Sequence, residues 1–332
     1  MSIPMDKVIA VVVTYNRRKL LSECIAALKN QSRKLDKILI VNNGSTDDTF
    51  DWLQNQTGVE FLSQENVGSA GGFHAGIKEA FDRNYSWIWL MDDDGYPRAD
   101  ALEKLLENQP EELCLRNCIV IDREDKKTLV WKTGKFTSYD QVDKKVINNY
   151  AHPFNGTMIH RKIVERVGLP SKQLFLWGDE GEYLYRIIKL HKIPCCTISD
   201  SIHYHPASAF SYKNDWNFGS GWKMYYYVRN RYHILISKFC HSRLLAFLLY
   251  VGFLLAFTGS IIIFQKTDRF KKLFMILWPA KDAFTGNFIA TPTSILERLA
   301  HSRNYSGVTI VNNIKSGLGL IFAKRIRASI HE

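Results

Sequence analysis

The sequence predicts an α/β fold, in which a mostly parallel sheet is flanked by helices and followed by a helical carboxyl-terminal region. Two observations support this prediction. Apolar runs of strand length alternate with amphipathic segments over residues 7–110, and their short links favour parallel strands joined by right-handed crossovers. After residue 213 the chain becomes aromatic, basic and helical in its periodicity. We therefore expect a sheet-containing domain over residues 1–212 and a helical region over residues 213–332.

The first expected strand, Lys7–Thr14, is almost continuously apolar, which is typical of a central parallel strand covered on both faces. The next segment has apolar residues at helical spacing, namely Leu20, Leu21, Cys24 and Leu28. The same reasoning predicts strands at Lys37–Val41, Val59–Leu62 and Ser86–Asp92. It also predicts three helices: one that begins near Asp47, one that ends near Phe81 and one that spans Ala99–Asn108.

Shorter elements are expected from residue 114 onward. The predicted strands are Arg116–Asp122, Thr128–Thr133, Val142–Val146, Phe154–Ile159 and Ile198–His205, and the predicted helices are Arg161–Val167, Tyr183–Leu190 and Trp222–Phe239. The first three of these strands extend the sheet or form a hairpin over the site. In an open sheet of this kind, ligands bind at the carboxyl ends of the strands, where Thr14, Asn43 and Asp92 lie. Residues 1–110 are therefore expected to bind a nucleotide.

Three consecutive carboxylates, Asp92, Asp93 and Asp94, follow the apolar run Trp87–Met91. Like charges at one strand end repel one another, so a fold that keeps them needs compensation. A divalent cation such as Mg²⁺ or Mn²⁺ supplies it, because hard cations take oxygen ligands and often share them with substrate phosphates. Alternation along a strand directs Asp92 and Asp94 to the same side. The alternative interpretation is a polar loop after a core strand.

A second acidic cluster, Asp179, Glu180 and Glu182, follows another apolar run, Leu174–Trp177. Acidic residues in a first helical turn are favoured by the helix dipole, which is the structural interpretation. In the functional interpretation, one acidic cluster holds a metal ion and the other supplies a general base, within hydrogen-bonding reach of the proton that it removes.

Two histidines and an arginine complete the polar candidates. His203 and His205 project to one side if they lie on a strand, so each is either a metal ligand or an ordinary packed histidine. Arg229 lies in an aromatic and basic helix and is a candidate clamp for a phosphate or carboxylate.

Residues 66–73 read Asn-Val-Gly-Ser-Ala-Gly-Gly-Phe and follow the third expected strand. They do not match the dinucleotide-binding fingerprint, which follows the first strand and requires an acidic residue at a set distance. Two interpretations remain. The glycines allow unusual backbone angles where a helix begins, or they let the backbone approach a phosphate or a sugar.

The composition is globular, with 46% hydrophobic and 23% charged residues in a chain of 332. No amino-terminal signal sequence is expected, because Met1–Lys7 is short and polar. The six cysteines are scattered, without a Cys-x-x-Cys pair, which favours a reducing, cytoplasmic location. The net charge of +11 favours anionic partners. The basic excess is heaviest after Lys213, near an apolar stretch, which indicates a membrane surface rather than nucleic acid.

That apolar stretch, Leu244–Phe264, is uncharged and long enough to span a bilayer. Basic residues flank both ends, so charge indicates no orientation. Three interpretations are open: an interfacial hairpin or monotopic anchor, a membrane span, and a buried helix of a soluble domain. Phe270–Trp278 is a further apolar and basic segment, and the tail Asn304–Glu332 is amphipathic and basic.

Several of these motifs together resemble the inverting family 2 glycosyltransferases of the GT-A fold. The motifs are Thr14-Tyr15-Asn16-Arg17, the run Asn-Asn-Gly-Ser-Thr-Asp-Asp-Thr at 42–49 and Asp92-Asp93-Asp94. The resemblance covers residues 7–110, continues through 177–183 and 229–230, and weakens after about residue 240. The loop at 66–73 is similar to the donor-site loop of bacterial galactofuranosyltransferases. Rhamnosyltransferases share most of the scaffold and are the close alternative.

For the acceptor side, the resemblance implies that Glu180 is the catalytic base and that Asp179 and Glu182 bind acceptor hydroxyls. Trp177 and Arg229 would add acceptor contacts. The base position carries glutamate where the family has aspartate, so either Asp179 or Glu180 is the base.

For the donor side, the resemblance implies that Asp94 and Asp92 hold Mn²⁺ or Mg²⁺ together with a histidine, and His205 fits the family's histidine better than His203. The family commonly has an acidic residue near Asn42 or Asn43 that accepts a bond from the nucleotide base, and here an amide oxygen would replace it. The residues expected to contact the nucleotide sugar are Thr14, Tyr15, Arg17, Asn43, Asn66, Gly71, Gly72, Phe73, Asp92 and Asp93.

The implied reaction is the transfer, with inversion, of galactofuranose from UDP-galactofuranose to a growing, lipid-linked polysaccharide of the bacterial cell surface, such as an O-antigen or a capsule. The alternative donor is dTDP-rhamnose. A metal ion would stabilise the charge that develops on the leaving diphosphate. The protein would act at the cytoplasmic face of the plasma membrane, attached peripherally or as a monotopic protein.

Two other classes of function use similar residues. A metal-dependent nucleotidyltransferase or phosphohydrolase also clusters aspartates, but it leaves the loop at 66–73 and the second acidic cluster unexplained. A non-catalytic protein that kept the scaffold would not need carboxylates in both clusters.

Overall fold

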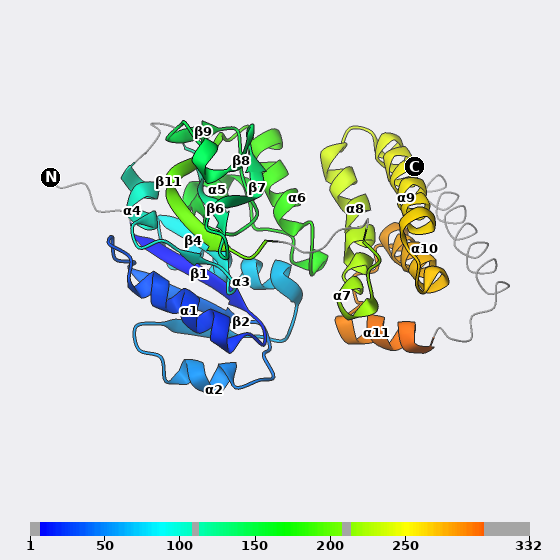
Figure 1. Ribbon diagram of the computed structural model, residues 1–332, viewed down its shortest axis with the longest axis horizontal. Coiled ribbons are helices and arrows are strands. Elements are labelled where there is room, and N and C mark those ends of the chain that lie inside the picture. The colour runs from blue at the N-terminus through cyan, green and yellow to red at the C-terminus, as the bar shows by residue number, and fades with distance from the viewer. Residues whose placement is uncertain (1–6, 108–112, 208–213, 302–332) are drawn as a thin grey trace, which may run out of the picture. The chain divides into compact units, whose positions relative to one another are not determined.

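The computed structural model describes residues 7–107, 113–207 and 214–301. The chain forms two compact units, and Figure 1 labels most of their elements. Of the described residues, the first unit comprises 7–107, 113–175 and 179–207, and the second comprises 176–178 and 214–301. The boundary expected at residues 212 and 213 and the amphipathic tail expected at 304–332 lie outside the described residues.

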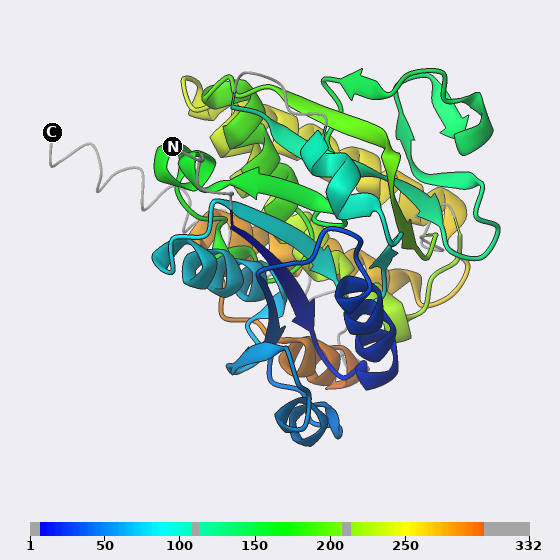
Figure 2. The same cartoon turned by 90° about the vertical axis from the view of Figure 1, so that its left-hand side faces the viewer.

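The first unit is built on an eleven-stranded sheet, whose strands run side by side in Figure 2. The main path has the order β3-β2-β1-β4-β10-β6-β11-β5; β7 pairs with β6 and β8, and β9 pairs with β11. The strands are β1 (Val8–Thr14), β2 (Lys37–Asn42), β3 (Glu60–Ser63), β4 (Trp87–Asp92), β5 (Tyr96–Pro97), β6 (Leu115–Asp122), β7 (Thr128–Thr133), β8 (Phe136–Ser138), β9 (Val146–Asn148), β10 (Thr157–His160) and β11 (Cys195–His205).

The pairing of the main path is mixed. Strands β1 to β4 pair in parallel, as do β6 and β11, whereas β10 runs antiparallel to both β4 and β6. The prediction of a mixed, mostly parallel sheet flanked by helices is therefore confirmed. The helices of this unit are α1 (Arg18–Lys29), α2 (Thr49–Gln54), α3 (Gly68–Asp82), α4 (Ala101–Glu107), α5 (Arg161–Val167) and α6 (Asp179–Tyr185).

The apolar run of β1 supplies both faces of the sheet, because successive side chains point in opposite directions. Val8, Ala10 and Val12 join a core with buried residues of α1 and α4. Ile9 and Val11, with Val13, join the other core, which α3 and α5 cover. Helices thus cover the central strands on both sides, as a near-continuous apolar strand predicts.

Two local predictions differ from the structure, and some elements were not predicted. The strand predicted at Val142–Val146 instead begins at Val146, as β9. Before it, Ser138 and Gln141 close a short 3₁₀ turn through a capping box, and this turn lies between β8 and β9. The intervening residues 143–145 are charged and exposed, so they gain nothing from sheet burial. Helix α6 begins at Asp179 rather than Tyr183, because its acidic residues occupy the first turn. Helix α11 (Pro292–His301) was not predicted.

The second unit is helical. Its other helices are α7 (Phe218–Gly221), α8 (Met224–Lys238), α9 (Arg243–Phe264) and α10 (Arg269–Thr285). Helix α9 packs through one stripe, formed by Ala246, Tyr250, Phe257 and Ile261, at helical spacing. This stripe meets apolar residues of α8 and α10, which together form a small core.

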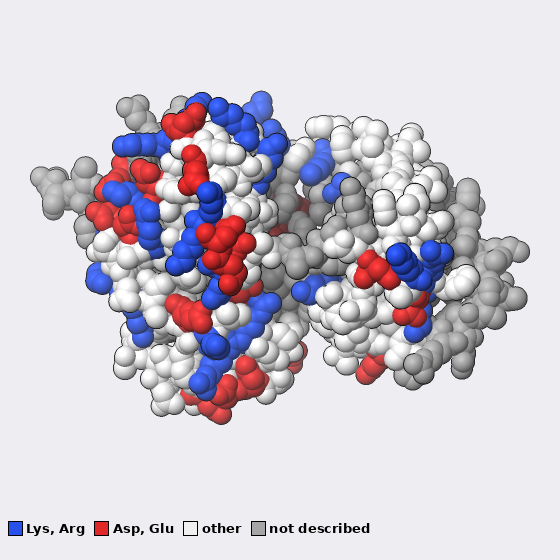
Figure 3. Space-filling view, viewed as in Figure 1, with Lys and Arg blue, Asp and Glu red and all other residues white. Residues whose placement is uncertain are grey.

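The remaining surface of α9 is exposed and apolar. Leu255 and Ile263 are 69% and 71% exposed, and only 17% of the most apolar window of this helix is buried. Figure 3 shows an almost uncharged surface over α9. Among the described helices, α9 is the one long and apolar enough to cross a membrane by length and composition. This exposure excludes the interpretation of α9 as a helix buried within the described residues.

Candidate active site

Strand register brings the predicted polar residues to one edge of the sheet. Parallel pairing aligns Thr14 with the last residue of β2 and aligns its neighbour Val13 with Asp92. The short strand β5 then pairs with the end of β11. Because Asp94 lies just before β5 and His205 is the last residue of β11, the two come together at this edge.

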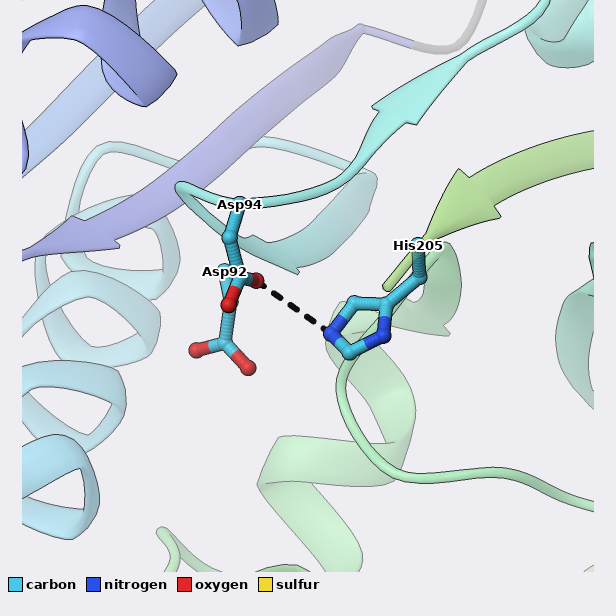
Figure 4. A group of neighbouring side chains, drawn as sticks. All are labelled: Asp92, Asp94 and His205. Carbon is cyan, nitrogen blue, oxygen red and sulfur yellow. Dashed lines mark ion pairs between the residues drawn. The ribbon is translucent and has the colours of Figure 1, made fainter. Parts of the chain in front are cut away.

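Asp92, Asp94 and His205 form a group that could hold a metal ion. Each offers one ligand atom, and these atoms all lie within 4.8 Å of one another. Asp94 and His205 point toward each other in Figure 4, with Oδ1 of the aspartate 3.2 Å from Nε2 of the histidine. The other ring nitrogen lies 2.7 Å from the backbone carbonyl of Pro206. Since a carbonyl only accepts hydrogen bonds, Nδ1 carries a proton, and in the neutral ring Nε2 faces the carboxylates as a lone pair.

The charges of this group are unequally distributed. Burial raises the pKa of Asp92 to about 7, and the nearby charge of Asp94 adds to the shift. Burial also disfavours ionised Asp94, but His205 and Arg17 outweigh this effect and lower its pKa to about 2. Burial lowers the pKa of His205, whereas Asp94 raises it more, so the net shift is upward. The negative charge of these two carboxylates exceeds the positive charge of the imidazole. A divalent cation would balance the excess.

The middle carboxylate, Asp93, faces the protein. It accepts hydrogen bonds from the Thr14 hydroxyl at 2.7 Å and from the Arg17 guanidinium at 3.1 Å. The same Arg17 nitrogen lies 2.8 Å from Asp94. Arg17 therefore pairs with two of the three aspartates, while its side chain stays 45% exposed beside them. Tyr15, on the same turn, is an exposed aromatic residue.

The second acidic cluster approaches the first within the same unit. Burial raises the pKa of Glu180 well above its ordinary value, and the charges of Asp179 and Asp92 raise it further. The segment before β10 touches both carboxylates: the backbone N–H of Phe154 bonds to Glu180, and the amide of Asn155 donates to Asp92 at 3.2 Å. Consecutive residues of one segment thus contact Glu180 and Asp92.

Asp179 has a different environment from its neighbour Glu180. Its side chain is 1% exposed, and neither oxygen has a hydrogen-bond partner of good geometry among the described residues. Burial raises its pKa to about 7. Glu182 is engaged elsewhere, because Arg186 donates to its two oxygens at 2.7 and 3.1 Å.

The loop at 66–73 is organised by buried side chains and close backbone packing. Asn43 donates to the Gly68 carbonyl at 2.9 Å, and Asn66 accepts from the Gly68 N–H at 3.0 Å. A Cβ on Gly72 would lie 2.5 Å from Val13 on β1, so this position requires glycine. Phe73 is fully buried and meets Phe154 edge to face. Gly71 is also buried, in the first turns of α3.

The remaining predicted residues lie farther from this group or in the other unit. His203 is fully buried beneath Gly95, and neither ring nitrogen has a hydrogen-bond partner among the described residues. Trp177 and Arg229 belong to the second unit. Trp177 lies against Tyr227, and Arg229 is fully buried among aromatic rings.

Two residues beside the predicted group were not anticipated from the sequence. Asn155 holds Asp92, as described above, and Trp131 on β7 packs against the ring of His205 with centroids 5.4 Å apart. The hairpin expected over the site therefore reaches the candidate metal ligand. The signal that could have indicated Asn155 is its place just before a short strand in Phe-Asn-Gly-Thr, a polar interruption of an apolar run.

Comparisons with known proteins agree with this geometry. Residues 9–168 match the model of the family described as Glycosyl transferase family 2. The crystal structure of S. aureus TarS shares the fold, with a TM-score of 0.51 and 15% sequence identity, over 88% of this chain and 50% of that one. The expected GT-A fold is thereby confirmed.

Two curated relatives carry the same name. The galactofuranosyltransferase GlfT1 of Mycolicibacterium smegmatis is 30% identical over 225 residues, which are 63% of this chain and 74% of that protein. The protein of the same name from Mycobacterium tuberculosis is 28% identical over 222 residues, covering 63% and 73% of the two chains. The chain is a glycosyltransferase, and it belongs to glycosyl transferase family 2.

Proposed function

We propose that the chain is an inverting, metal-dependent galactofuranosyltransferase that uses UDP-galactofuranose and extends a lipid-linked polysaccharide of the bacterial cell surface. One observation supports the mechanism above all others. Within the first unit, two consecutive residues contact the two sites: the backbone N–H of Phe154 bonds to Glu180, and the side-chain amide of Asn155 donates to Asp92 at 3.2 Å. A candidate base and a candidate metal site therefore share one end of the sheet.

The proposed metal ligands are Asp92, Asp94 and His205. Two carboxylates with one imidazole suit Mn²⁺ better than Mg²⁺, because Mg²⁺ prefers oxygen ligands and water. The proton on Nδ1 of His205, held by Pro206, leaves Nε2 available as a ligand. When bound, the ion supplies positive charge to the diphosphate of the leaving group.

The proposed base is Glu180. Its carboxylate removes the proton of the acceptor hydroxyl while the oxygen of that hydroxyl bonds to the anomeric carbon and the bond to the diphosphate breaks. One displacement of this kind inverts the anomeric configuration. Arg17, which already lies between two aspartates and solvent, is placed to bind a phosphate of the donor.

The support for galactofuranose as the donor sugar is the printed name of the two curated relatives. Rhamnose from dTDP-rhamnose stays the alternative, as the resemblance implied. Asn43 already binds within the chain through both ends of its amide, so recognition of the nucleotide base by this residue would require a shared hydrogen bond.

Membrane attachment through α9 would bring the enzyme to a lipid-linked acceptor. The exposed face of α9 is apolar, and exposed cations lie at its two ends, Arg243 and Lys266. The helices packed on its other face carry charges, such as the exposed Lys281 of α10. Those charges would be costly in hydrocarbon, so we favour a helix lying along the inner leaflet over one that spans it.

A panel of nucleotide sugars tests the proposed donor. The protein is incubated with UDP-galactofuranose, dTDP-rhamnose and other common donors, with Mn²⁺, Mg²⁺ or a chelator, and thermal shift and product formation are recorded. The proposal predicts turnover with UDP-galactofuranose that depends on the divalent cation. Turnover with dTDP-rhamnose alone, or undiminished turnover in chelator, would contradict it.

A further inference from the structure

The segment that leads into Glu180 has an unusual backbone. Phe175 and Trp177 have φ angles of +64° and +58°, and Gly178 has a φ of +104°. Positive φ is unfavourable for bulky residues, and asparagine and aspartate tolerate it better. Two aromatic residues in this conformation, within one segment before a candidate base, must therefore be held by their surroundings.

The side chain of Asn230, on α8, makes the principal contacts with this segment. Its Nδ2 donates to the backbone carbonyl of Leu176 at 2.9 Å and to that of Trp177 at 2.8 Å. Its Oδ1 accepts a hydrogen bond of 3.0 Å from Nε of Arg229. Asn230 is fully buried, so these bonds form in a low-dielectric environment, where each carries more weight.

Packing on α8 supports the same conformation. A Cβ on Gly178 would lie 2.6 Å from the terminal methyl of Ile234, which would have to move, and the φ of +104° itself favours glycine. The Trp177 ring meets Tyr227 edge to face, with centroids 6.4 Å apart, and Lys223 lies over its face. Residues 176–178 are thus held by polar and apolar contacts that come from a single helix.

The residue before this segment is fixed separately, within the first unit. The carbonyl of Phe175 accepts a hydrogen bond of 3.1 Å from the N–H of Ala70. A Cβ on Gly68 would lie 2.0 Å from that carbonyl, so the first glycine of the loop at 66–73 allows this close approach. Phe175 is thus held within the first unit, residues 176–178 are held within the second, and Asp179 follows directly.

We propose that Asn230 is a positioning residue: it fixes the backbone of residues 176–178 and thereby sets where the Glu180 carboxylate lies. The inference rests on the proposed role of Glu180 as the base. It also gives the buried Arg229 a role that differs from acceptor binding, because Arg229 orients the amide of Asn230 so that the NH₂ group faces the two carbonyls.

The test compares two variants of Asn230 with a matched control in the full-length protein. Asn230→Ala removes both hydrogen bonds to the segment. Asn230→Asp keeps the size of the side chain and its acceptor for Arg229 but replaces the donor, so the test does not depend on the folding of the alanine variant. Gln265→Ala is the control, because Gln265 is also fully buried in the second unit, and its Nε2 donates to the carbonyl of Asn214 at 2.8 Å.

Steady-state kinetics, donor dissociation constants and thermal stability are measured for all three variants. Since small displacements of a catalytic group cost up to about 100-fold in rate, both Asn230 variants should lose about 10- to 100-fold in kcat. Their donor KM and dissociation constant should stay within about twofold, because the donor contacts are intact. Gln265→Ala should lose thermal stability but keep its kcat.

Two results would overturn the inference. One is an unchanged kcat in a folded Asn230 variant, and the other is a loss of kcat in Gln265→Ala as large as that in Asn230→Ala. Glu180→Gln, measured in parallel, separates this outcome from failure of the proposed function. An inactive Glu180→Gln with fully active Asn230 variants rejects only the role of Asn230, whereas a fully active Glu180→Gln rejects the base assignment and the inference with it.

Discussion

Nε2 of His205 lies 3.2 Å from Oδ1 of Asp94, and the pairing of β5 with β11 brings the two side chains together. Asp94 follows the central strand β4, and His205 is the last residue of β11, which lies three places from β4 in the sheet order. Through this contact, His205 joins Asp92 and Asp94 in a group of defined geometry. The proposed metal dependence is based on this group.

Substitution of Asp94 tests that dependence. Asp94→Asn keeps the shape of the side chain but removes the charge that is ionised most readily in the group. Loss of a charged ligand at a catalytic cation removes several kcal/mol of transition-state stabilisation, so turnover should fall at least about 100-fold. Activity is measured across a Mn²⁺ titration, with the exposed Asp51 of α2, as Asp51→Asn, serving as the control. An Asp94→Asn enzyme with the metal response of the wild type would contradict the assignment.

Arg17 offers a test of donor binding with a neighbouring control. Arg17 pairs with Asp93 and Asp94, whereas Arg18 pairs with the exposed Asp48. Because a charged hydrogen bond is worth about 1.5–3 kcal/mol, Arg17→Ala should weaken donor binding by about tenfold or more. Calorimetric titration with UDP and Mn²⁺ measures the effect. Arg18→Ala should bind like the wild type, and equal losses in the two variants would show that general charge, not this contact, attracts the donor.

Because Asp179 is buried, we expect the free energy of unfolding to depend on pH. Burial raises its pKa in the folded protein to about 7, whereas an unfolded aspartate has a pKa of about 3.9. Between these values the folded state binds the proton and the unfolded state does not, so the free energy of unfolding decreases as the pH rises from about 4 to 7.

Asp179→Asn should therefore reduce the difference in stability between pH 5 and pH 8, by about 1–2 kcal/mol after allowance for relaxation. Denaturant unfolding at both pH values, without metal, measures this difference. A variant that shows the same pH dependence as the wild type would indicate that Asp179 ionises normally in the folded protein.

The exposed face of α9 predicts membrane binding. Leu248, Leu255 and Ile263 are more than half exposed, and burial of each such side chain contributes about 1.5–3 kcal/mol. Replacing all three with glutamine should lower binding to anionic phospholipid vesicles by more than about tenfold in flotation. Ile289→Gln is the control, because Ile289 is exposed in the same unit but outside α9. Unchanged vesicle binding by the triple variant would contradict the proposed attachment.

The sequence contained enough local information to predict much of this fold. The uninterrupted apolar run of β1 indicated a strand covered on both faces, and the structure shows alternate residues of that run in two cores. The prediction of a strand at Val142–Val146 was wrong in its bounds. Its few apolar residues gain too little from burial to outweigh the exposed charges between them.

The site was only partly predictable, because its contacts join distant parts of the chain. The two acidic clusters could be found as charges that end apolar runs. The contact of Asn155 with Asp92 depends on the antiparallel pairing of β10 with β4, and no local pattern specified that pairing. The same holds for Trp131 beside His205. The hydrogen bonds of Asn230 to the backbone of residues 176 and 177 depend on the backbone angles of residues 175–178. In the sequence, only Gly178 indicates that these angles are unusual.

The central claim concerns two groups of carboxylates, one that binds a cation with the donor and one that activates the acceptor. The most direct test is Glu180→Gln, assayed for binding of UDP-galactofuranose with Mn²⁺ and for sugar transfer to an acceptor. The account predicts donor affinity within about twofold of the wild type and a loss of transfer of at least about 100-fold. Transfer at the wild-type rate would contradict the account.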